Sequence, residues 1–429
     1  MLTAKISLLL MLVAFLVTTL VYPHVLSLAH RYNIVDNPNA RKLQRVPVPV
    51  MGGMTVLIGF LVSAVVCYCV EPLPKMPVAG VLLVVVYLIG FWDDVRDVSP
   101  TLRFLLELLV VWMMILLLGL EINDFHGLWG VHRIPEAVSV PLSLIAGVGV
   151  MNAINMIDGV DGYCSTFGIM ACAVFAVVFY HAGDMAMFAL ALITIGALVP
   201  FFFHNVFGKT SKMFLGDGGS MMLGAILVLC MFSVLSSDSV CAEAYRDSGF
   251  CLPALALAVL AIPVFDTLKV MAIRIAKGYS PFRPDKTHLH HLFIEMDFTH
   301  LATSGFIVLT NAVIVGCLFL AWSLGAGIDL QLYIVIVLGM LATWGFYFYM
   351  EWQHRQNDGE GSRVFQRWYE GGKITNFTSK RSWQFIRRVV DSRFLAGKWG
   401  AGAGSGAAAG GPASPVSPLV KERPDPRIN

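Results

Sequence analysis

The stretch "VAGVLLVVVYLIGFWDDVRD" (residues 78–97) is an almost uninterrupted apolar run that ends in three aspartates. An apolar run of this kind is typical of a membrane span, for which ~20 mostly apolar residues are needed. The chain as a whole has 429 residues, of which 57% are hydrophobic and only 14% charged. A water-soluble domain carries more charge than this. We therefore expect an all-α, polytopic membrane protein.

Hydrophobic segments recur along most of the chain, and they predict about 11 transmembrane helices. The first is too long for the core of a signal peptide and is not followed by a small-residue cleavage site, so we expect it to be retained as a span. The predicted spans are 4–24, 50–70, 78–92, 101–120, 138–156, 163–181, 184–203, 219–236, 251–275, 301–324 and 329–350.

The basic residues predict the orientation, because short cytoplasmic loops carry an excess of Lys and Arg. Most of the basic residues between spans fall in alternate loops, within residues 31–45, 96–103, 209–212 and 277–286. This places the N-terminus outside and the C-terminus in the cytoplasm. The net charge of +2 is small and its basic residues are dispersed, so we expect no nucleic-acid partner.

Composition divides the chain into three parts. Residues 1–350 form the predicted transmembrane domain. Residues 351–395 are basic and contain Trp and Phe, which suits either an interfacial helix or a solvated tail. Residues 396–429 are rich in Gly, Ala and Pro and are expected to be disordered. The eight cysteines show no metal-binding spacing, but Cys241 and Cys251 flank a predicted outer loop and could form a disulfide.

Five polar clusters all fall at the predicted cytoplasmic ends of spans. Ionisable groups near the membrane are costly and usually functional, so their shared position predicts one site. The clusters are "DNPNARKLQRVPVPVMGG" (36–53), "DDVRDVSPTLR" (93–103), "NAINMIDGVDG" (152–162), "KMFLGDGGS" (212–220) and "RPDKTHLHH" (283–291).

The carboxylates in these clusters indicate a magnesium site. Asp93 and Asp97 share a face if the helix continues, whereas Asp94 diverges from them. Neighbouring carboxylates repel unless a cation or a proton lies between them, and few hard oxygen ligands favour Mg²⁺ completed by substrate phosphates. The glycine-flanked Asp217 precedes another span, where backbone N–H groups could meet a phosphate.

The remaining clusters offer amides and cations. Asn152 and Asn155 lie one turn apart within an apolar span, and Asp158 and Asp161 each precede a glycine. His288 and His291 would share a helix face without His290, and the cluster lacks the pattern of a zinc site. We expect the histidines, with the basic residues of the first and last clusters, to face phosphate groups.

In this order, the clusters resemble the polyprenyl-phosphate N-acetylhexosamine-1-phosphate transferase family from residue 36 to about residue 291. The family patterns DDxxD, NxxNxxDGxDG and GDxGS are present. The "HLHH" spacing is similar to the sugar-initiating, GlcNAc-transferring branch rather than the muramoyl-pentapeptide branch, which typically has three consecutive histidines. One departure is Gln44, where many members have a histidine. That departure leaves Arg41 and Lys42 as the phosphate-binding residues of the first cluster.

The resemblance implies a reaction in which a UDP-N-acetylhexosamine donates its sugar 1-phosphate to undecaprenyl phosphate and UMP is released. It implies Mg²⁺, with Mn²⁺ as the alternative metal, and a multi-pass location in the bacterial inner membrane with the active site on the cytoplasmic face. Membrane lipid surrounds such an enzyme, and a homodimer is one oligomeric state that the sequence leaves open.

The resemblance implies that Asp93, Asp94 and His288 are catalytic residues and that Asp94 and Asp217 bind the metal ion. It implies that the substrates are bound by Arg41, Lys42, Asn152, Asn155, Asp158, Asp161, Arg283, His290 and His291. Whether the lipid phosphate attacks directly or after an aspartyl-phosphate forms stays open. The alternatives in function are a muramoyl-pentapeptide-type phosphotransferase and, in a different class, an ion-coupled secondary transporter, whose polar groups would lie near the bilayer midplane.

Overall fold

A computed structural model describes residues 3–36, 47–73, 75–96, 98–281, 287–296, 298–356, 386 and 389–391. The predictions for Arg41, Lys42, Asp97 and Arg283, and those for most of residues 351–395 and all of 396–429, concern residues outside these ranges.

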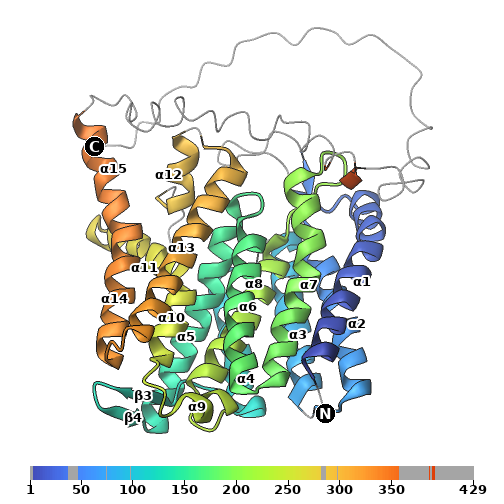
Figure 1. Cartoon of the computed structure of the whole chain (residues 1–429). Helices are drawn as coiled ribbons and strands as arrows, with labels where there is room; N and C mark the ends of the chain where they lie inside the picture. Colours follow the sequence, from blue (N-terminus) through green and yellow to red (C-terminus); the bar gives the residue numbers. More distant parts are fainter. Residues whose placement is uncertain are drawn as a thin grey trace, which may run out of the picture.

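Long helices running side by side form the body of the protein (Figure 1). Ten of the described helices are long and apolar enough to cross a membrane, or up to eleven if one bent pair counts as a span. The predicted number of spans is therefore confirmed. The long helices are α1 (Ala4–Arg31), α2 (Gly52–Val70), α3 (Lys75–Arg96), α4 (Pro100–Leu118), α5 (Glu136–Met156), α6 (Tyr163–Ala182), α7 (Met185–Phe207), α8 (Gly216–Leu235), α13 (His300–Ser323) and α14 (Ile328–Met340), which continues through a π-helical turn, Leu341–Gly345, into α15 (Phe346–Gln356).

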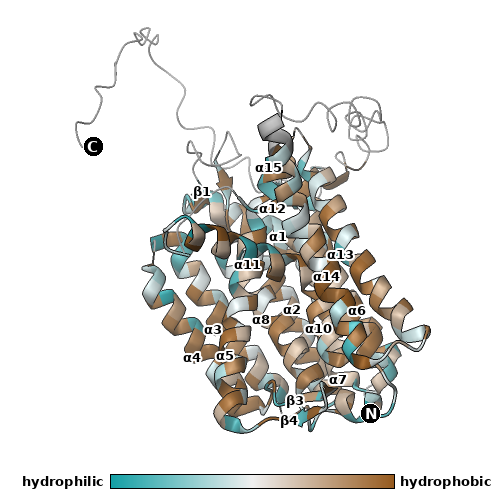
Figure 2. Cartoon of the chain, turned by 90° about the vertical axis from the view of Figure 1, so that its left-hand side faces the viewer, coloured by the Kyte–Doolittle hydropathy of each residue, from teal (hydrophilic) through white to brown (hydrophobic). Residues whose placement is uncertain are grey.

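The centre of the bundle is α8, whose side chains are almost all buried. It packs against α3, α5 and α2. The outer helices instead present apolar side chains outward, and Figure 2 shows hydrophobic residues along the helices with hydrophilic segments at their ends. An apolar exterior of this kind suits lipid, because lipid solvates apolar side chains. Because α8 is central, it is in contact with α3, α5 and α2 at the same time.

The predicted span 251–275 is broken into α10 (Leu252–Val259) and α11 (Ala261–Ala276), which meet at a bend of 72°. Buried Asn311 of α13 satisfies the backbone at the break. Its Nδ2 donates to the carbonyls of Ala258 (3.1 Å) and Val259 (3.0 Å), and its Oδ1 accepts from the N–H of Ile262 (2.9 Å). A broken helix at membrane depth requires such partners.

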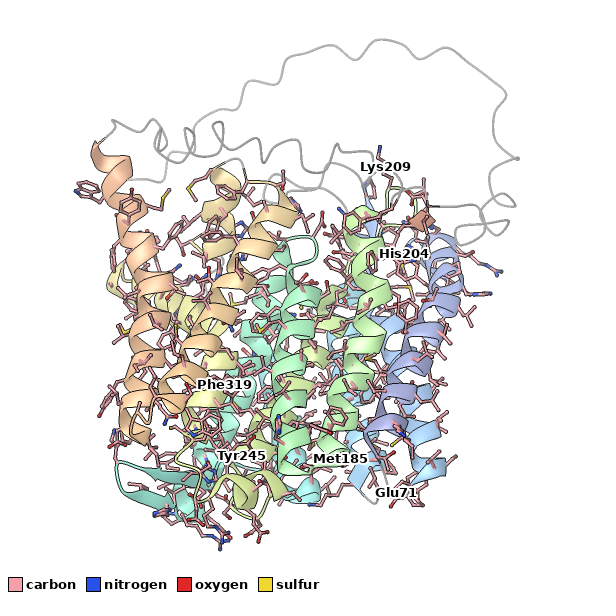
Figure 3. The ribbon with its side chains drawn as sticks, in the orientation of Figure 1. Glu71, Met185, His204, Lys209, Tyr245 and Phe319 are labelled. Carbon is pink, nitrogen blue, oxygen red and sulfur yellow. The ribbon has the colours of Figure 1, made fainter. Side chains whose placement is uncertain are left out.

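Short elements close the two ends of the bundle. Glu71, Met185 and Tyr245 lie at one end, and His204 and Lys209 at the other (Figure 3). The first end also carries α9 (Val240–Tyr245) and the hairpin of β3 (Asp124–Leu128) and β4 (Val131–Arg133). The other end carries α12 (Leu289–Glu295) and the short pair β1 (Val35–Asp36) and β2 (Val48–Pro49).

The suggested disulfide does not form. Cys241 and Cys251 are both free and fully buried. Cys241 lies on α9, and Cys251 directly precedes α10. Both thiols pack within the hydrophobic core of the bundle, so they behave as small apolar side chains.

A close helix crossing at Gly90 places the end of α3 against the start of α8. A Cβ atom at Gly90 would lie 2.5 Å from the carbonyl oxygen of Asp217 and 2.6 Å from the Cα of Gly218. We expect Gly90→Ala to force the two helices apart and destabilise the fold by about 1–3 kcal/mol, the usual cost of overpacking. Thermal unfolding in detergent measures this.

Gly80→Ala is the matched control on the same helix, because its Cβ would meet only Leu61 Cδ2, at 3.8 Å. Its unfolding temperature should be unchanged or slightly raised, since Ala is a better helix former than Gly. Equal effects of the two substitutions would contradict the close crossing.

Candidate active site

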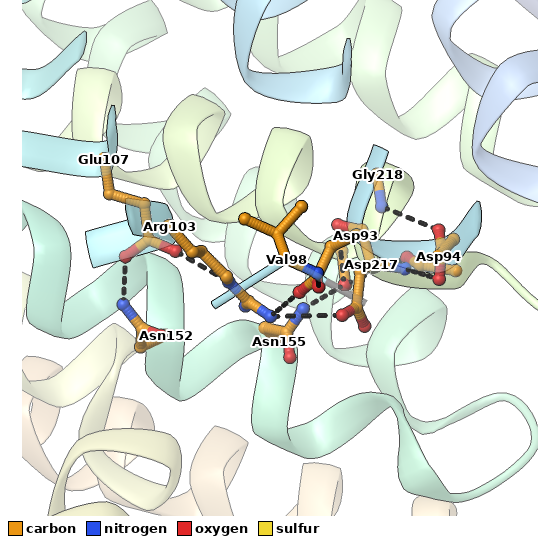
Figure 4. Close-up of polar contacts among 11 residues, drawn as sticks. Asp93, Asp94, Val98, Arg103, Glu107, Asn152, Asn155, Asp217 and Gly218 are labelled. Atoms are coloured by element: carbon orange, nitrogen blue, oxygen red, sulfur yellow. Dashed lines mark hydrogen bonds and ion pairs between the residues drawn. The ribbon is translucent and has the colours of Figure 1, made fainter. Parts of the chain in front are cut away.

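The end of the bundle opposite Glu71 gathers the polar clusters that are far apart in the sequence. Asp93 and Asp94 come from the end of α3, and Asp217 from the first turn of α8. Asn155 comes from the end of α5, and Asp158 from the 3₁₀ turn Ile157–Gly159 that follows it. Figure 4 shows the carboxylates of α3 and α8 facing one another. The structure thus unites three of the predicted motifs in one site.

The Asp94 side chain connects the end of α3 to the start of α8 by hydrogen bonds. Its carboxylate accepts hydrogen bonds from the backbone N–H groups of Asp217 (3.0 Å) and Gly218 (3.2 Å). These N–H groups have no partner within the helix, and a carboxylate is favourable beside the helix N-terminus. Gly216 allows this approach, because it has a φ of 76° and a Cβ there would lie 2.7 Å from Asp94 Oδ2.

Arg103, near the start of α4, lies between the carboxylates of two other helices (Figure 4). Its Nη1 donates to Asp93 Oδ2 (2.8 Å) and to Asp217 Oδ2 (3.1 Å). Asp93 Oδ1 also accepts from the backbone N–H of Val98 (2.8 Å). The Asp93 and Asp94 side chains therefore diverge, as predicted. A guanidinium group between two carboxylates offsets the repulsion expected from the sequence.

Arg103 also contacts another residue of α4. Its Nε donates to Glu107 Oε1 (3.0 Å), and the side chain of Glu107 is only 1% exposed. The other Glu107 oxygen accepts from the side-chain amide of Asn152. The amide of Asn155, one turn further along α5, donates to Ser220 Oγ (3.1 Å) on α8. The two asparagines thus connect α5 to α4 and to α8.

The two aspartates of the DGxDG turn have different partners. Asp158 lies beside the backbone of Gly216, just before Asp217. Asp161 Oδ2 accepts from Lys212 Nζ (2.6 Å) and lies 2.9 Å from His300 Nδ1. Burial raises the pKa of Asp161, but the hydrogen bond from His300 and the charge of Lys212 outweigh it and hold the pKa below its ordinary value. Asp161 is therefore ionised.

His288 is held by a buried ion pair that the sequence analysis did not include. Its Nδ1 lies 2.9 Å from Asp266 Oδ2 of α11, and Asp266 Oδ1 accepts from Lys269 Nζ (2.7 Å). Nε2 of His288 is buried and has no hydrogen-bond partner among the residues that the structure describes. An imidazole fixed at one nitrogen leaves the other free for a ligand.

The predicted arrangement of the three histidines is wrong in one respect. The helix begins after His288, so His288 and His291 do not share a helix face. Instead, the ring of His288 stacks on that of His290 at 5.7 Å, and the rings of His290 and His291 lie 4.3 Å apart. Burial, followed by the charges of His291 and His288, lowers the pKa of His290 to about 3. His290 is therefore neutral near pH ~7.

The other contacts of the carboxylates determine how well each could bind Mg²⁺. Within the described ranges, no three Asp, Glu, His or Cys side chains form a ready-made metal centre. Mg²⁺ does not require one, because one or two carboxylates with water and substrate phosphates suffice. The Asp217 side chain, 37% exposed, is the more accessible, whereas both Asp94 oxygens already accept N–H groups. The donor set fits the ion, with Asp217 the better-placed ligand.

The sequence analysis placed Arg103 in the second polar cluster without giving it a role, and it missed Glu107, Asp266 and Lys269. The last three lie within predicted spans, and an intramembrane ionisable residue is itself a signal of function. That signal could have found them. It could not have shown that Arg103 meets Asp217, because the two residues are 114 positions apart.

The long apolar helices, with a carboxylate-rich polar site at one end of the bundle, are those of a multi-pass integral membrane protein. Comparison with known proteins shows which family this chain is similar to. The model of glycosyl transferase family 4 matches residues 76–235, which contain α3 to α8 and the three united motifs. The matched part of the chain is similar to this family, and the curated relatives support the resemblance to the polyprenyl-phosphate sugar-1-phosphate transferases.

Curated relatives agree over most of the chain. A Bacillus subtilis (strain 168) protein named "Probable undecaprenyl-phosphate N-acetylglucosaminyl 1-phosphate transferase" is 28% identical over 334 residues, 76% of this chain and 87% of the relative. The Escherichia coli (strain K12) undecaprenyl-phosphate alpha-N-acetylglucosaminyl 1-phosphate transferase is 29% identical over 70% of this chain and 78% of its own. The Yersinia pestis protein of the same name is 27% identical over 66% and 75%.

Proposed function

We propose that this protein transfers N-acetylhexosamine 1-phosphate from a UDP-sugar to undecaprenyl phosphate, with release of UMP. The observation that carries the proposal is that Asp93, Asp94 and Asp217 meet at one end of the bundle. Arg103 lies between Asp93 and Asp217, and Asp94 accepts from the backbone N–H of Asp217. The names of the relatives support the same acceptor and reaction. We assign this end to the cytoplasmic face of the bacterial inner membrane, where a soluble nucleotide-sugar and a lipid headgroup both have access.

The reaction joins two anions, and this determines what the site must supply. An oxygen of the lipid phosphate attacks the β-phosphorus of the donor. The bond from that phosphorus to the bridging oxygen breaks, and UMP leaves with the electron pair. Fixed cations that offset the charge of the three phosphates lower the barrier. Arg103 and Lys212 are cations that the structure places in or beside the site.

The carboxylates would have two roles in this reaction. Asp217 and Asp94 would hold Mg²⁺, which supplies positive charge to the donor diphosphate when bound. Asp93 would accept the proton of the lipid phosphate. Because the second pKa of such a phosphate is near ~6, this group would contribute more to orientation than to proton removal around pH ~7. The hydrogen bonds from Arg103 and Val98 hold Asp93 in one orientation.

The donor would be held on the other side of the site. The nucleotide-sugar would be held by Asn152 and Asn155 of α5, by Asp158 of the 3₁₀ turn that follows, and by Asp161. The free Nε2 of His288, together with His290 and His291, would face the diphosphate. The Asp266 carboxylate fixes the ring of His288 for that contact.

The test is UMP release by purified protein in detergent, with undecaprenyl phosphate and a panel of UDP-N-acetylhexosamines. We expect release that requires both the lipid and Mg²⁺, that stops on chelation and returns when Mg²⁺ is restored. The panel identifies the sugar. Release without lipid would show donor hydrolysis instead of transfer. No release from a folded protein with any donor would contradict the proposal.

A further inference from the structure

A segment near the C-terminus lies against the loop that joins α7 to α8. Figure 1 shows this segment in red beside the ends of α7 and α1. The Asp391 carboxylate accepts from the backbone N–H groups of Lys209 (3.0 Å) and Ser211 (3.3 Å), and from the hydroxyls of Thr210 (3.2 Å) and Ser211 (2.9 Å). Val390 beside it is only 6% exposed. One carboxylate thus orders three consecutive loop residues.

The same loop is anchored to the helices beneath it. The backbone carbonyl of Ser211 accepts from the hydroxyl of Tyr22 (2.8 Å), and Ser211 Oγ lies 3.0 Å from His204 Nδ1. The rings of Tyr22 and His204 stack at 3.9 Å. Because Ser211 Oγ donates to Asp391, it accepts from His204. Ser211 therefore has partners on α1, on α7 and in the C-terminal segment.

The residues that follow Ser211 reach the site. Lys212 donates to Asp161. The carbonyl of Met213 accepts from Asn205 Nδ2 (2.9 Å), and Asn205 Oδ1 accepts from the N–H of Gly162 (2.7 Å). The loop and the DGxDG turn are thus connected by two contacts. Ser211 is directly followed by Lys212, whose ammonium group pairs with Asp161.

The charge of Asp391 suits this position. Burial raises its pKa, but the hydrogen bonds from the loop outweigh burial and hold the pKa below its ordinary value. The carboxylate is therefore ionised near pH ~7, and a charged acceptor forms stronger hydrogen bonds than a neutral one.

We propose that the C-terminal segment around Asp391 is a clamp on the α7–α8 loop, and that the clamp positions Lys212 against Asp161 for binding of the donor. The docking surface is residues 209–211, and its partner is residues 389–391 of the same chain. The effect on the donor rests on the proposed function. The reacting carboxylates lie on α3 and α8, so loss of the clamp weakens donor binding more than the chemical step.

The test compares the full-length protein with Asp391→Asn in detergent, by hydrogen exchange of the loop and by steady-state kinetics. We expect exchange in residues 208–213 to be about 5-fold faster and the KM for the UDP-sugar to rise by about 5-fold with kcat nearly unchanged, as for the loss of a charge-assisted hydrogen bond. Thr210→Val, which removes one donor, should give a smaller change in the same direction. Asp425→Asn removes the same charge elsewhere in the tail and should change neither quantity.

Each measurement tests a separate part of the proposal. Unchanged exchange in the loop of Asp391→Asn would overturn the clamp. Faster exchange with an unchanged KM would overturn its link to the donor. Exchange needs no substrate, so a wild-type protein that releases no UMP would contradict the proposed function while the docking is still tested.

Discussion

Asp94→Asn is expected to abolish UMP release while the protein stays folded. Asparagine keeps an oxygen that can accept one of the N–H bonds from Asp217 or Gly218, so α3 remains attached to α8. The negative charge beside the helix N-terminus is lost, and with it a ligand for the proposed metal. Loss of one such electrostatic group lowers kcat by about 10²–10³-fold, and we expect at least this loss. UMP release and thermal unfolding together measure it.

Asp238→Asn is the matched control for this experiment. Asp238 pairs with Arg133, its side chain is 76% exposed, and it follows the far end of α8 from Asp217. The Asp238→Asn variant loses the same negative charge as Asp94→Asn, but outside the site, and it should keep normal turnover. Near-normal turnover of Asp94→Asn would remove Asp94 from the proposed metal ligands, whereas a protein that no longer folds would make Asp94 chiefly a structural residue.

Arg103→Met is expected to lower both stability and activity. It leaves Asp93 and Asp217 without their shared partner and Glu107 without its cation. Removing one member of a buried ionic group typically destabilises a protein by about 3–5 kcal/mol, since the remaining charges are uncompensated. The unpaired carboxylates would also repel the anionic substrates. Thermal unfolding and UMP release measure the two effects.

Two further variants separate charge from packing. Arg103→Lys keeps the charge but not the two-sided geometry of the guanidinium, so it should preserve most of the stability. Glu107→Gln in the Arg103→Met background removes the buried unpaired charge and should recover part of the lost stability. If the double variant is no more stable than Arg103→Met, the destabilisation does not come from the buried charge of Glu107.

The bend between α10 and α11 is a feature that the sequence alone does not predict. Its hydropathy predicts one continuous span over residues 251–275, and the length and composition are indeed sufficient for one. The break depends on Asn311, a residue about fifty positions further on, whose side chain satisfies the backbone groups released at the bend. Local composition carries no information about such a distant partner.

The sequence by itself determined the all-α membrane architecture, the number of spans and the motifs that meet at one end. These follow from hydropathy and from the position of polar residues at the ends of apolar runs, which are local properties of the chain. Only the tertiary structure decided that Arg103 lies between Asp93 and Asp217, that Asp266 fixes His288, and that Asp391 orders the α7–α8 loop. Each of these contacts joins segments that only helix packing brings together.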